Sequence, residues 1–510
     1  MMEMLLSVSN VNLKWLLACL LALLYVSAVI VYRLFLHPLA KFPGPKLAAA
    51  TVCYEMYYDF VRPRQFPFKI RQLHDQYGPV IRITPHEIHI QDPDFYNELF
   101  ANPPKVREKY AGWTRTFSDK ILLGTVSDEV HRPRRQAMAP LFSKQNIVRL
   151  GPIILERLEK LCKILDNTAA SDGAIRLDVA FMALTTDIIS QYSFGRDPCY
   201  LDQDDMGIWF KDGMQNVFTS FTLFRHFPFF RPLYEILIPT VLAVLSPIWR
   251  DRARVRKASD DEVRRILSED PKEKSPEDVN TRTIFHTLRD SKLAASEKTF
   301  VRLQQEARAL IGGGGETTAA SLYRLWYYLL TSPSKLDKLL NEIKTVMPSP
   351  ASPVPTLDKV AGLPYLNAVI NEAIRLSGST TTRTARVCPN ETLACHGFDI
   401  PPGTPVSMTN ALVLHDPTIF PEPEKFVPER WLNNKSLLRY QVAFSKGSRA
   451  CLGINLAYAE MELTTAVLSS RFSFELYRTT IDDVQWKRDC FVAFPNKDSK
   501  GVRVKVKPRQ

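Results

Sequence analysis

The sequence predicts a mainly helical protein with a small β lobe, preceded by an N-terminal transmembrane helix. Three observations point to this fold class. Residues 15–32 carry no charge, residues 296–331 and the chain from Ile454 onward place apolar side chains at helical spacing, and residues 80–90 tend toward the alternation of a strand. The assignment of the whole chain depends on the motifs described below.

The composition limits the class of protein. The chain has 510 residues, of which 45% are hydrophobic and 24% charged, with no internal repeat or low-complexity tract. Its eight cysteines show no pairing pattern, which favours free thiols in a reducing compartment. The net charge is +12, but the basic residues form no long runs, so we expect no nucleic-acid partner. A membrane surface or an acidic protein fits better.

Residues 15–32 are predicted to cross a membrane. As a helix they would reach about 27 Å, and the apolar residues up to Leu36 can extend them. A cleaved signal peptide is the alternative, but the stretch exceeds the usual apolar region of about 7–15 residues and no small-residue cleavage site ends it. The flanking basic residues are Lys14 before the stretch and Arg33, Lys41 and Lys46 after it. We therefore predict a single-pass anchor over residues 1–36, with the rest of the chain in the cytoplasm.

A proline-rich segment follows the predicted anchor. Its core is Phe42-Pro-Gly-Pro45, which is stiff and cannot be helical. We assign residues 37–50 to a hinge and residues 51–510 to one globular domain. Within that domain, a helix is expected from His131 to Met138.

Residues 218–249 are rich in aromatic and apolar side chains. Prolines at positions 228, 232, 239 and 247 exclude one continuous membrane span. Contact with a membrane and ordinary core packing explain the individual side chains of this stretch equally well.

Residues 296–331 are predicted to form one helix of about 50 Å. Four consecutive glycines, 312–315, stand at its centre and are followed by Glu316 and Thr317. Each glycine costs about 0.5–1 kcal/mol relative to alanine in a helix, which suggests a close approach or a bend. A linker between two helices is the alternative, although strong helical patterns flank both sides.

Two further patterns lie downstream. Glu372 and Arg375 are three positions apart, which places both charges on one face of a helix, and Arg430 follows in the sequence PERW. Cys451 lies in the segment FSKGSRACLG, residues 444–453, just before a helix. The helix N-terminus and Arg449 should favour its thiolate, and one thiolate without further metal ligands suits an axial position on a haem iron.

These motifs together resemble the cytochrome P-450 family. Residues 444–453 match its cysteine signature FxxGxRxCxG, residues 314–317 match its oxygen-activation motif, and ExxR and PERW follow the family's order along nearly the whole chain. The resemblance implies the mostly helical P-450 fold, with residues 51–510 as the catalytic domain and haem b bound through Cys451. The segments FPGPKLAA and RLSGSTTTRTARV are similar to fungal secondary-metabolism members of the trichodiene oxygenase type.

The resemblance also implies the remaining cofactor contacts. His131 stands where the family usually has tryptophan, and Arg386 has Arg383 as a competitor. The implied contacts are Arg135, His131, Arg386, Phe444, Gly447, Arg449 and Gly453. Arg132 and Arg134 are expected to be solvent-exposed or to dock an acidic partner. The family's Glu–Arg–Arg cluster corresponds to Glu372, Arg375 and Arg430.

The implied activity is monooxygenation with O2 and NADPH-derived electrons from a separate reductase, with cytochrome b5 as an optional partner. Thr317 and Glu316 are implied to handle protons. The expected substrate is a hydrophobic terpenoid or polyketide-type molecule, and the polar run 377–382 suggests oxygens on it. The expected location is the endoplasmic reticulum membrane. A rearrangement without O2 or reductase and a non-catalytic haem-binding membrane protein remain open, although the intact Glu316–Thr317 pair argues against both.

Overall fold

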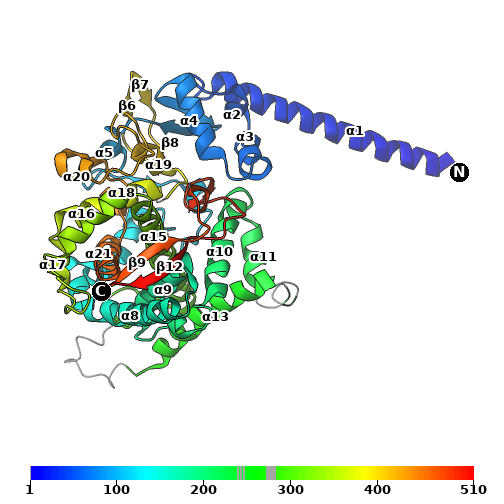
Figure 1. Ribbon diagram of the computed structural model, residues 1–510. Coiled ribbons are helices and arrows are strands. Elements are labelled where there is room, and N and C mark those ends of the chain that lie inside the picture. The colour runs from blue at the N-terminus through cyan, green and yellow to red at the C-terminus, as the bar shows by residue number, and fades with distance from the viewer. Residues whose placement is uncertain are drawn as a thin grey trace.

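The structure is a computed structural model that describes residues 2–237, 241, 244, 247–270, 283–378 and 380–509. Helices dominate these residues, and strands form four small sheets (Figure 1). The predicted fold class is therefore confirmed. In Figure 1 the helical body occupies the lower part, and the larger sheet with α2 to α4 lies above it.

Six helices frame the site described below. They are α7 (Asp128–Met138), α9 (Leu177–Phe194), α10 (Ile208–His226), α15 (Phe300–Leu330), α18 (Pro364–Ser377) and α21 (Ile454–Arg471). The other α-helices of the described residues are α1 (Met2–Val31), α2 (Lys46–Ala50), α3 (Cys53–Met56), α4 (Phe66–Tyr77), α5 (Tyr96–Leu99), α6 (Ala111–Thr114), α8 (Lys144–Ala170), α11 (Phe230–Leu237), α13 (Pro247–Ser268), α14 (Ile284–Asp290), α16 (Pro333–Ile343), α17 (Leu357–Ala361), α19 (Asn410–Leu414) and α20 (Glu429–Asn433).

The largest sheet has the strand order β1-β2-β8-β5-β3, with only the β2–β8 pair parallel. Its strands are β1 (Val80–Thr84), β2 (Glu87–Ile90), β3 (Glu108–Lys109), β5 (Thr384–Val387) and β8 (Pro405–Met408). The smaller sheets are β4 (Ala174–Arg176) with β12 (Arg503–Pro508) and β9 (Phe472–Leu476), β6 (Leu393–Cys395) with β7 (Phe398–Ile400), and β10 (Arg488–Cys490) with β11 (Val492–Phe494).

Helix α15 is the central element of the helical body. It packs against α9, α13, α18 and α21, so its buried face belongs to the main hydrophobic core. The prediction of one unbroken helix through the four glycines is confirmed. The helix begins at Phe300, later than predicted, because the Thr299 hydroxyl caps it by accepting from the backbone N–H of Arg302.

The helix around His131 begins earlier than predicted. Helix α7 starts at Asp128, because the Ser127 hydroxyl caps it by accepting from the backbone N–H of Glu129. Two acidic residues in its first turn favour the same start.

Helix α1 projects away from the rest of the chain (Figure 1). Among the described residues, Lys14–Leu36 is the one segment long and apolar enough to cross a membrane; its mean hydropathy is 2.4 and none of its most apolar stretch is buried. A signal sequence would meet the same criterion. The proline-rich segment after it packs on the globule. The Pro43 carbonyl accepts a hydrogen bond from the backbone N–H of Arg82, and a Cβ at position 44 would lie 2.5 Å from the Arg82 carbonyl oxygen.

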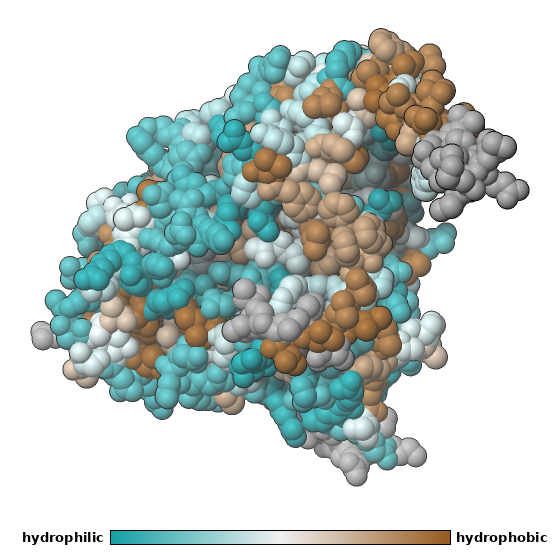
Figure 2. Space-filling model, turned by 90° about the vertical axis from the view of Figure 1, so that its right-hand side faces the viewer, coloured by the Kyte–Doolittle hydropathy of each residue, from teal (hydrophilic) through white to brown (hydrophobic). Residues whose placement is uncertain are grey.

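Apolar side chains also reach the surface on the side of α11. That side, seen in Figure 2, carries extensive hydrophobic surface. The aromatic-rich stretch from residue 218 therefore divides: Phe218 and Phe224 are buried in the core, whereas other residues are exposed, namely Phe229, Phe230, Leu233, Ile236, Val241 and Val244. Residues 238–240, 242, 243, 245 and 246 of this stretch lie outside the described residues.

Candidate active site

Cys451 lies in a tight turn between a short 3-10 helix, Gly447–Arg449, and α21. Its backbone N–H donates to the Phe444 carbonyl at 2.8 Å, which closes the turn. Gly447 has a φ of +72°, and a Cβ there would lie 2.4 Å from the carbonyl oxygen of Phe100. A side chain at position 447 would therefore force the loop away from the Phe100 backbone. Gly453 has no such protein neighbour, since a Cβ there would face open space.

A cavity of about 320 Å³ separates the cysteine loop from α15. The cysteine loop and α15 both contribute residues to its lining. From the loop these are Phe444, Arg449, Cys451 and Gly453, and from α15 Gly313, Gly314 and Thr317. The Cys451 side chain is deep in the protein, but its surface is accessible from the cavity.

The electrostatics of Cys451 differ from the sequence-based expectation. Burial raises the pKa of the Cys451 thiol, and this effect exceeds the opposing hydrogen bond from Gly453 and the charge of Arg135. Arg449, which was expected to favour the thiolate, instead donates to the carbonyls of Thr125 and Val126. A positive charge bound in the cavity, such as a metal ion, would favour the thiolate.

One end of the cavity collects basic side chains, most of them arginine or lysine, which we call the cation cluster. Its members are Lys109, His131, Arg135, Arg386 and Arg449. Within the part of the chain that the structure describes, Lys109, Arg135 and Arg386 form no ion pair. Arg386 is fully buried and donates only to the neighbouring Ala385 carbonyl at 3.1 Å. Buried cations without anions are costly, so this end of the cavity fits a ligand that carries carboxylates.

The members of the cation cluster influence each other's protonation. Burial and the neighbouring arginines lower the pKa of Lys109 well below its usual range. Burial and the other positive charges lower the pKa of His131 to about 2, so its imidazole is neutral and can donate one N–H. Burial also lowers the pKa of Arg386 to about 10.

Lys109 was missed by the sequence analysis. Strand β3 pairs with β5 in a register that sets Lys109 opposite Arg386. This juxtaposition depends on a two-residue strand inside a segment that appears irregular in the sequence. The competitor Arg383 is directed elsewhere, because its guanidinium binds Glu55 at 2.8 Å and Glu87 at 2.7 Å.

The two neighbouring arginines of α7 have different environments. Arg132 is exposed and pairs with Asp128 at 2.8 Å, as a solvated face predicts. The same expectation is wrong for Arg134, which is buried and donates to both carboxylate oxygens of Glu297 at 2.7 and 2.8 Å. The ion pair links α7 to the segment before α15 and leaves Arg134 no surface for a partner.

The glycines of α15 have distinct neighbours. A Cβ at Gly312, Gly314 or Gly315 would lie 2.8 Å from side-chain atoms of Met214, Ile189 and Thr186, respectively. Three glycines therefore allow α9 and α10 to approach closely. A Cβ at Gly313 would meet no atom within 4 Å, and Gly313 lines the cavity.

Thr317 and Glu316 point in different directions. The Thr317 hydroxyl faces the cavity and donates to the Gly313 carbonyl at 2.6 Å, one turn back. Glu316 is buried and faces Lys211, which pairs with Asp178 at 2.9 Å. Burial raises the pKa of Glu316 to about 7, although the charge of Lys211 opposes this shift. A carboxyl group with this pKa exchanges protons near neutral pH.

Glu372, Arg375 and Arg430 form a second charged group, which we call the core ion cluster. Arg375 donates to both carboxylate oxygens of Glu372 at 2.9 Å, and Arg430 adds a third bond at 3.2 Å. The Trp431 indole N–H donates to the same carboxylate at 2.9 Å. The contacts connect α18 to α20 in the arrangement that the family resemblance implied.

The polar run 377–382 faces the cavity only in part. Thr381 and Thr382 both donate to one oxygen of Asp489, at 2.8 and 2.7 Å, so their hydroxyls fasten β10 and do not face a ligand. Thr380 and Ser377 line the cavity, as does Phe491 opposite them. Ser379 lies outside the described residues.

Comparison with known proteins agrees with this site. The family model described as cytochrome P450 matches residues 52–499. The chain is 40% identical over 504 residues to cytochrome P450 monooxygenase tpcC of Cochliobolus heterostrophus, covering 95% of each chain. It is 39% identical to cytochrome P450 monooxygenase sdnE of Sordaria araneosa, covering 95% of this chain and 96% of the relative. It is 37% identical to tryptophan 6-hydroxylase fscE of Fusarium equiseti, covering 93% of each.

Proposed function

Since the chain belongs to the cytochrome P450 family and is a haem-thiolate monooxygenase similar to those of fungal secondary metabolism, we propose that it hydroxylates or epoxidises a hydrophobic small molecule of the terpenoid or polyketide type. The observation that carries this proposal is the position of Cys451 and Thr317 on opposite walls of one cavity, next to the cation cluster, in which Lys109, Arg135 and Arg386 have no ion-pair partner among the described residues. The apolar lining around Phe491 and Leu310 supports a hydrophobic substrate.

The residues present fit haem b. Cys451 would bind the iron, and the cation cluster would hold the two propionates by charge-assisted hydrogen bonds. Gly453 would leave room over the ring, while Phe444 and Gly447 would fix the loop. Bound haem would supply the oxidative chemistry with O2, and the protein would orient the substrate and control protons.

The proton-handling roles divide between two positions. Thr317 would hold its Oγ1 at a fixed position on the cavity wall, because the hydroxyl donates to the Gly313 carbonyl, and this oxygen would accept a hydrogen bond from water or a protonated group in the cavity. Glu316 would take up and release protons on the side of α15 that faces the Lys211–Asp178 pair, because its pKa is about 7. The electrons would come from NADPH through a separate reductase, with cytochrome b5 as an optional second donor.

We also propose that the enzyme is anchored in the endoplasmic reticulum membrane by α1, with its catalytic domain in the cytoplasm. The exposed apolar segment Lys14–Leu36 and the exposed apolar side chains of α11 support membrane contact on one side of the molecule. Fractionation of cells that express a chain without residues 1–36 tests this placement. The truncated chain should leave the membrane pellet in part and keep its haem; complete loss of haem would assign the segment to the fold.

Coupling measurements test the oxidative function. With reductase, NADPH and substrate, Thr317→Ala should keep haem and NADPH consumption but form about 100-fold less product per NADPH and more hydrogen peroxide, as loss of a proton-handling hydroxyl predicts. Thr317→Ser is the matched control, because it keeps the hydroxyl, and should retain most of the coupling. Product formed by the wild type without NADPH would contradict the proposal and favour a rearrangement instead.

A further inference from the structure

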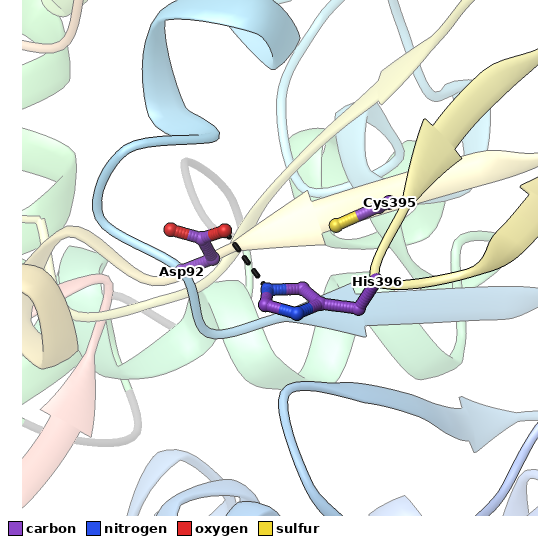
Figure 3. Close-up of side chains that lie close together, drawn as sticks. All are labelled: Asp92, Cys395 and His396. Carbon is purple, nitrogen blue, oxygen red and sulfur yellow. Dashed lines mark hydrogen bonds and ion pairs between the residues drawn. The ribbon is translucent and has the colours of Figure 1, made fainter.

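Three potential metal-binding side chains converge outside the active-site cavity, and we call them the hairpin triad: Asp92, Cys395 and His396. Strands β6 and β7 pair Cys395 with Phe398, so His396 and Gly397 form a two-residue turn with φ values of +47° and +78°. Asp92 comes from the connection between β2 and α5. Figure 3 shows the thiol, the imidazole and the carboxylate pointing toward one another.

The distances within the hairpin triad suit a small cation. The sulfur, a ring nitrogen and a carboxylate oxygen all lie within 4.8 Å of one another. His396 Nε2 and Asp92 Oδ2 are 2.9 Å apart. In a tetrahedral zinc site, bonds of about 2.0–2.3 Å separate the ligand atoms by about 3.3–3.5 Å. Adjustments of about 1 Å would therefore bring all three atoms to ligand distance.

The supporting contacts orient Asp92 for this role. Its Oδ1 accepts from the backbone N–H groups of Asp94 at 2.9 Å and Phe95 at 3.4 Å, which leaves Oδ2 for His396. Such outer contacts orient metal-binding carboxylates in known sites. Cys395 is buried whereas His396 is exposed, so an ion could enter from solution and keep a water ligand.

A second group of three similar residues shows what the hairpin triad lacks. Glu55, Asp59 and His226 also converge, but Arg383 binds Glu55 at 2.8 Å and Arg225 binds Asp59 at 2.7 Å. Arginines thus supply the positive charge there. Among the described residues, Asp92 has no lysine or arginine partner, and His396 is its one ion-pair partner.

We propose that Asp92, Cys395 and His396 bind one zinc ion, with water in the fourth position. A thiolate, an imidazole and a carboxylate are the ligand types that zinc prefers. Binding replaces the proton of the Cys395 thiol, which passes to solvent, and no electron is transferred. The site is separate from the cavity at Cys451, whose lining does not include these residues.

The ion would connect two segments behind the cysteine loop. It joins the β6–β7 hairpin to the chain that continues through α5 to Phe100. The carbonyl of Phe100 is the atom that closely faces Gly447. Zinc would therefore brace the backbone that supports the Cys451 turn.

Zinc titration of the full-length holoprotein in detergent tests the proposal. After treatment with a chelator, isothermal titration calorimetry with Zn²⁺ should show one saturable site, and elemental analysis after gel filtration should find one zinc per chain. Cys395→Ser, His396→Gln and Asp92→Asn should each weaken binding by more than the about 10–100-fold typical of removing an outer-shell contact.

Cys199→Ser is the matched control. Cys199 also lies near a carboxylate, with its sulfur 2.9 Å from Asp197 Oδ1, but it is exposed and has no histidine beside it among the described residues. This variant should bind zinc as the wild type does, and an unchanged haem spectrum in every variant shows that the fold is kept. The absence of saturable zinc binding in the wild type would overturn the proposal, as would equal affinity in Cys395→Ser.

Discussion

Two buried charged clusters, the core ion cluster and the cation cluster, differ in whether their cations have a carboxylate partner. In the core ion cluster, Arg375 and Arg430 both bind the Glu372 carboxylate. In the cation cluster, fully buried Arg386 has no ion-pair partner among the described residues, although it lies beside other cations. Buried cations that share a carboxylate are satisfied within the fold, whereas buried cations without a carboxylate fit an anionic ligand. This difference separates residues that maintain the structure from residues that form the site.

The largest expected effect comes from removing the shared carboxylate of the core ion cluster. Glu372→Gln leaves the buried Arg375 charge without its carboxylate, so the free energy of unfolding should fall by about 3–5 kcal/mol. Chemical unfolding measures this loss. Glu424→Gln is the control, because the Glu424 side chain is 58% exposed, and it should change the stability by less than about 1 kcal/mol. Equal stability of the two variants would remove the distinction between the clusters.

Glu316 tests the same comparison with a buried carboxyl group that has no ion-pair partner among the described residues. Its pKa of about 7 in the folded protein exceeds the usual value of 4.5, so folding favours the protonated form. The resulting destabilisation is absent below about pH 4.5, grows up to pH 7 and is complete above it. Glu316→Gln should therefore stabilise the protein by about 3 kcal/mol at pH 8 and by little at pH 4.5. Thermal unfolding at both pH values measures this difference; an equal effect at both would contradict the raised pKa.

Arg386→Met should have two smaller effects of opposite sign, one on the haem-bound protein and one on the haem-free protein. With haem bound, the variant loses charge-assisted hydrogen bonds of about 1.5–3 kcal/mol, so haem transfer to apomyoglobin should be about 10-fold faster or more. Without haem, the variant removes one of several repelling cations, and its stability should stay equal or rise slightly. Arg375→Met should destabilise both forms. If Arg386→Met behaved in the same way, Arg386 would belong to the structural core.

Features set by residues close together in the chain were predictable from local patterns, whereas long-range contacts were not, except where the family resemblance implied them, as for Glu372 and Arg430. The length of α15 and the turn at Cys451 follow from local patterns, namely helical spacing and glycines at fixed positions. Lys109 became visible only through its register with Arg386. Arg134 looked exposed because its partner Glu297 lies on a distant segment of the chain. Thr381 and Asp489 are also far apart in the chain, so their contact was not visible in the sequence.

The direction of the Cys451 pKa shift was also unpredictable from the sequence. The neighbouring helix N-terminus and Arg449 are visible in the sequence, but the depth of burial is not. Because burial dominates, the thiol pKa rises where the local motif suggested a decrease. The sequence motif thus proposes Cys451 as a ligand but does not indicate the direction of its thiol pKa shift.

The spectrum of the reduced, carbon-monoxide-bound protein tests the central claim most directly. The wild type should show the long-wavelength Soret band of a thiolate-ligated haem. Cys451→Ala should lose that band and the activity. Cys490→Ala, which changes a buried cysteine outside the cavity lining, should keep both. A Cys451→Ala protein that retained the band would contradict the assignment of Cys451 as the haem ligand.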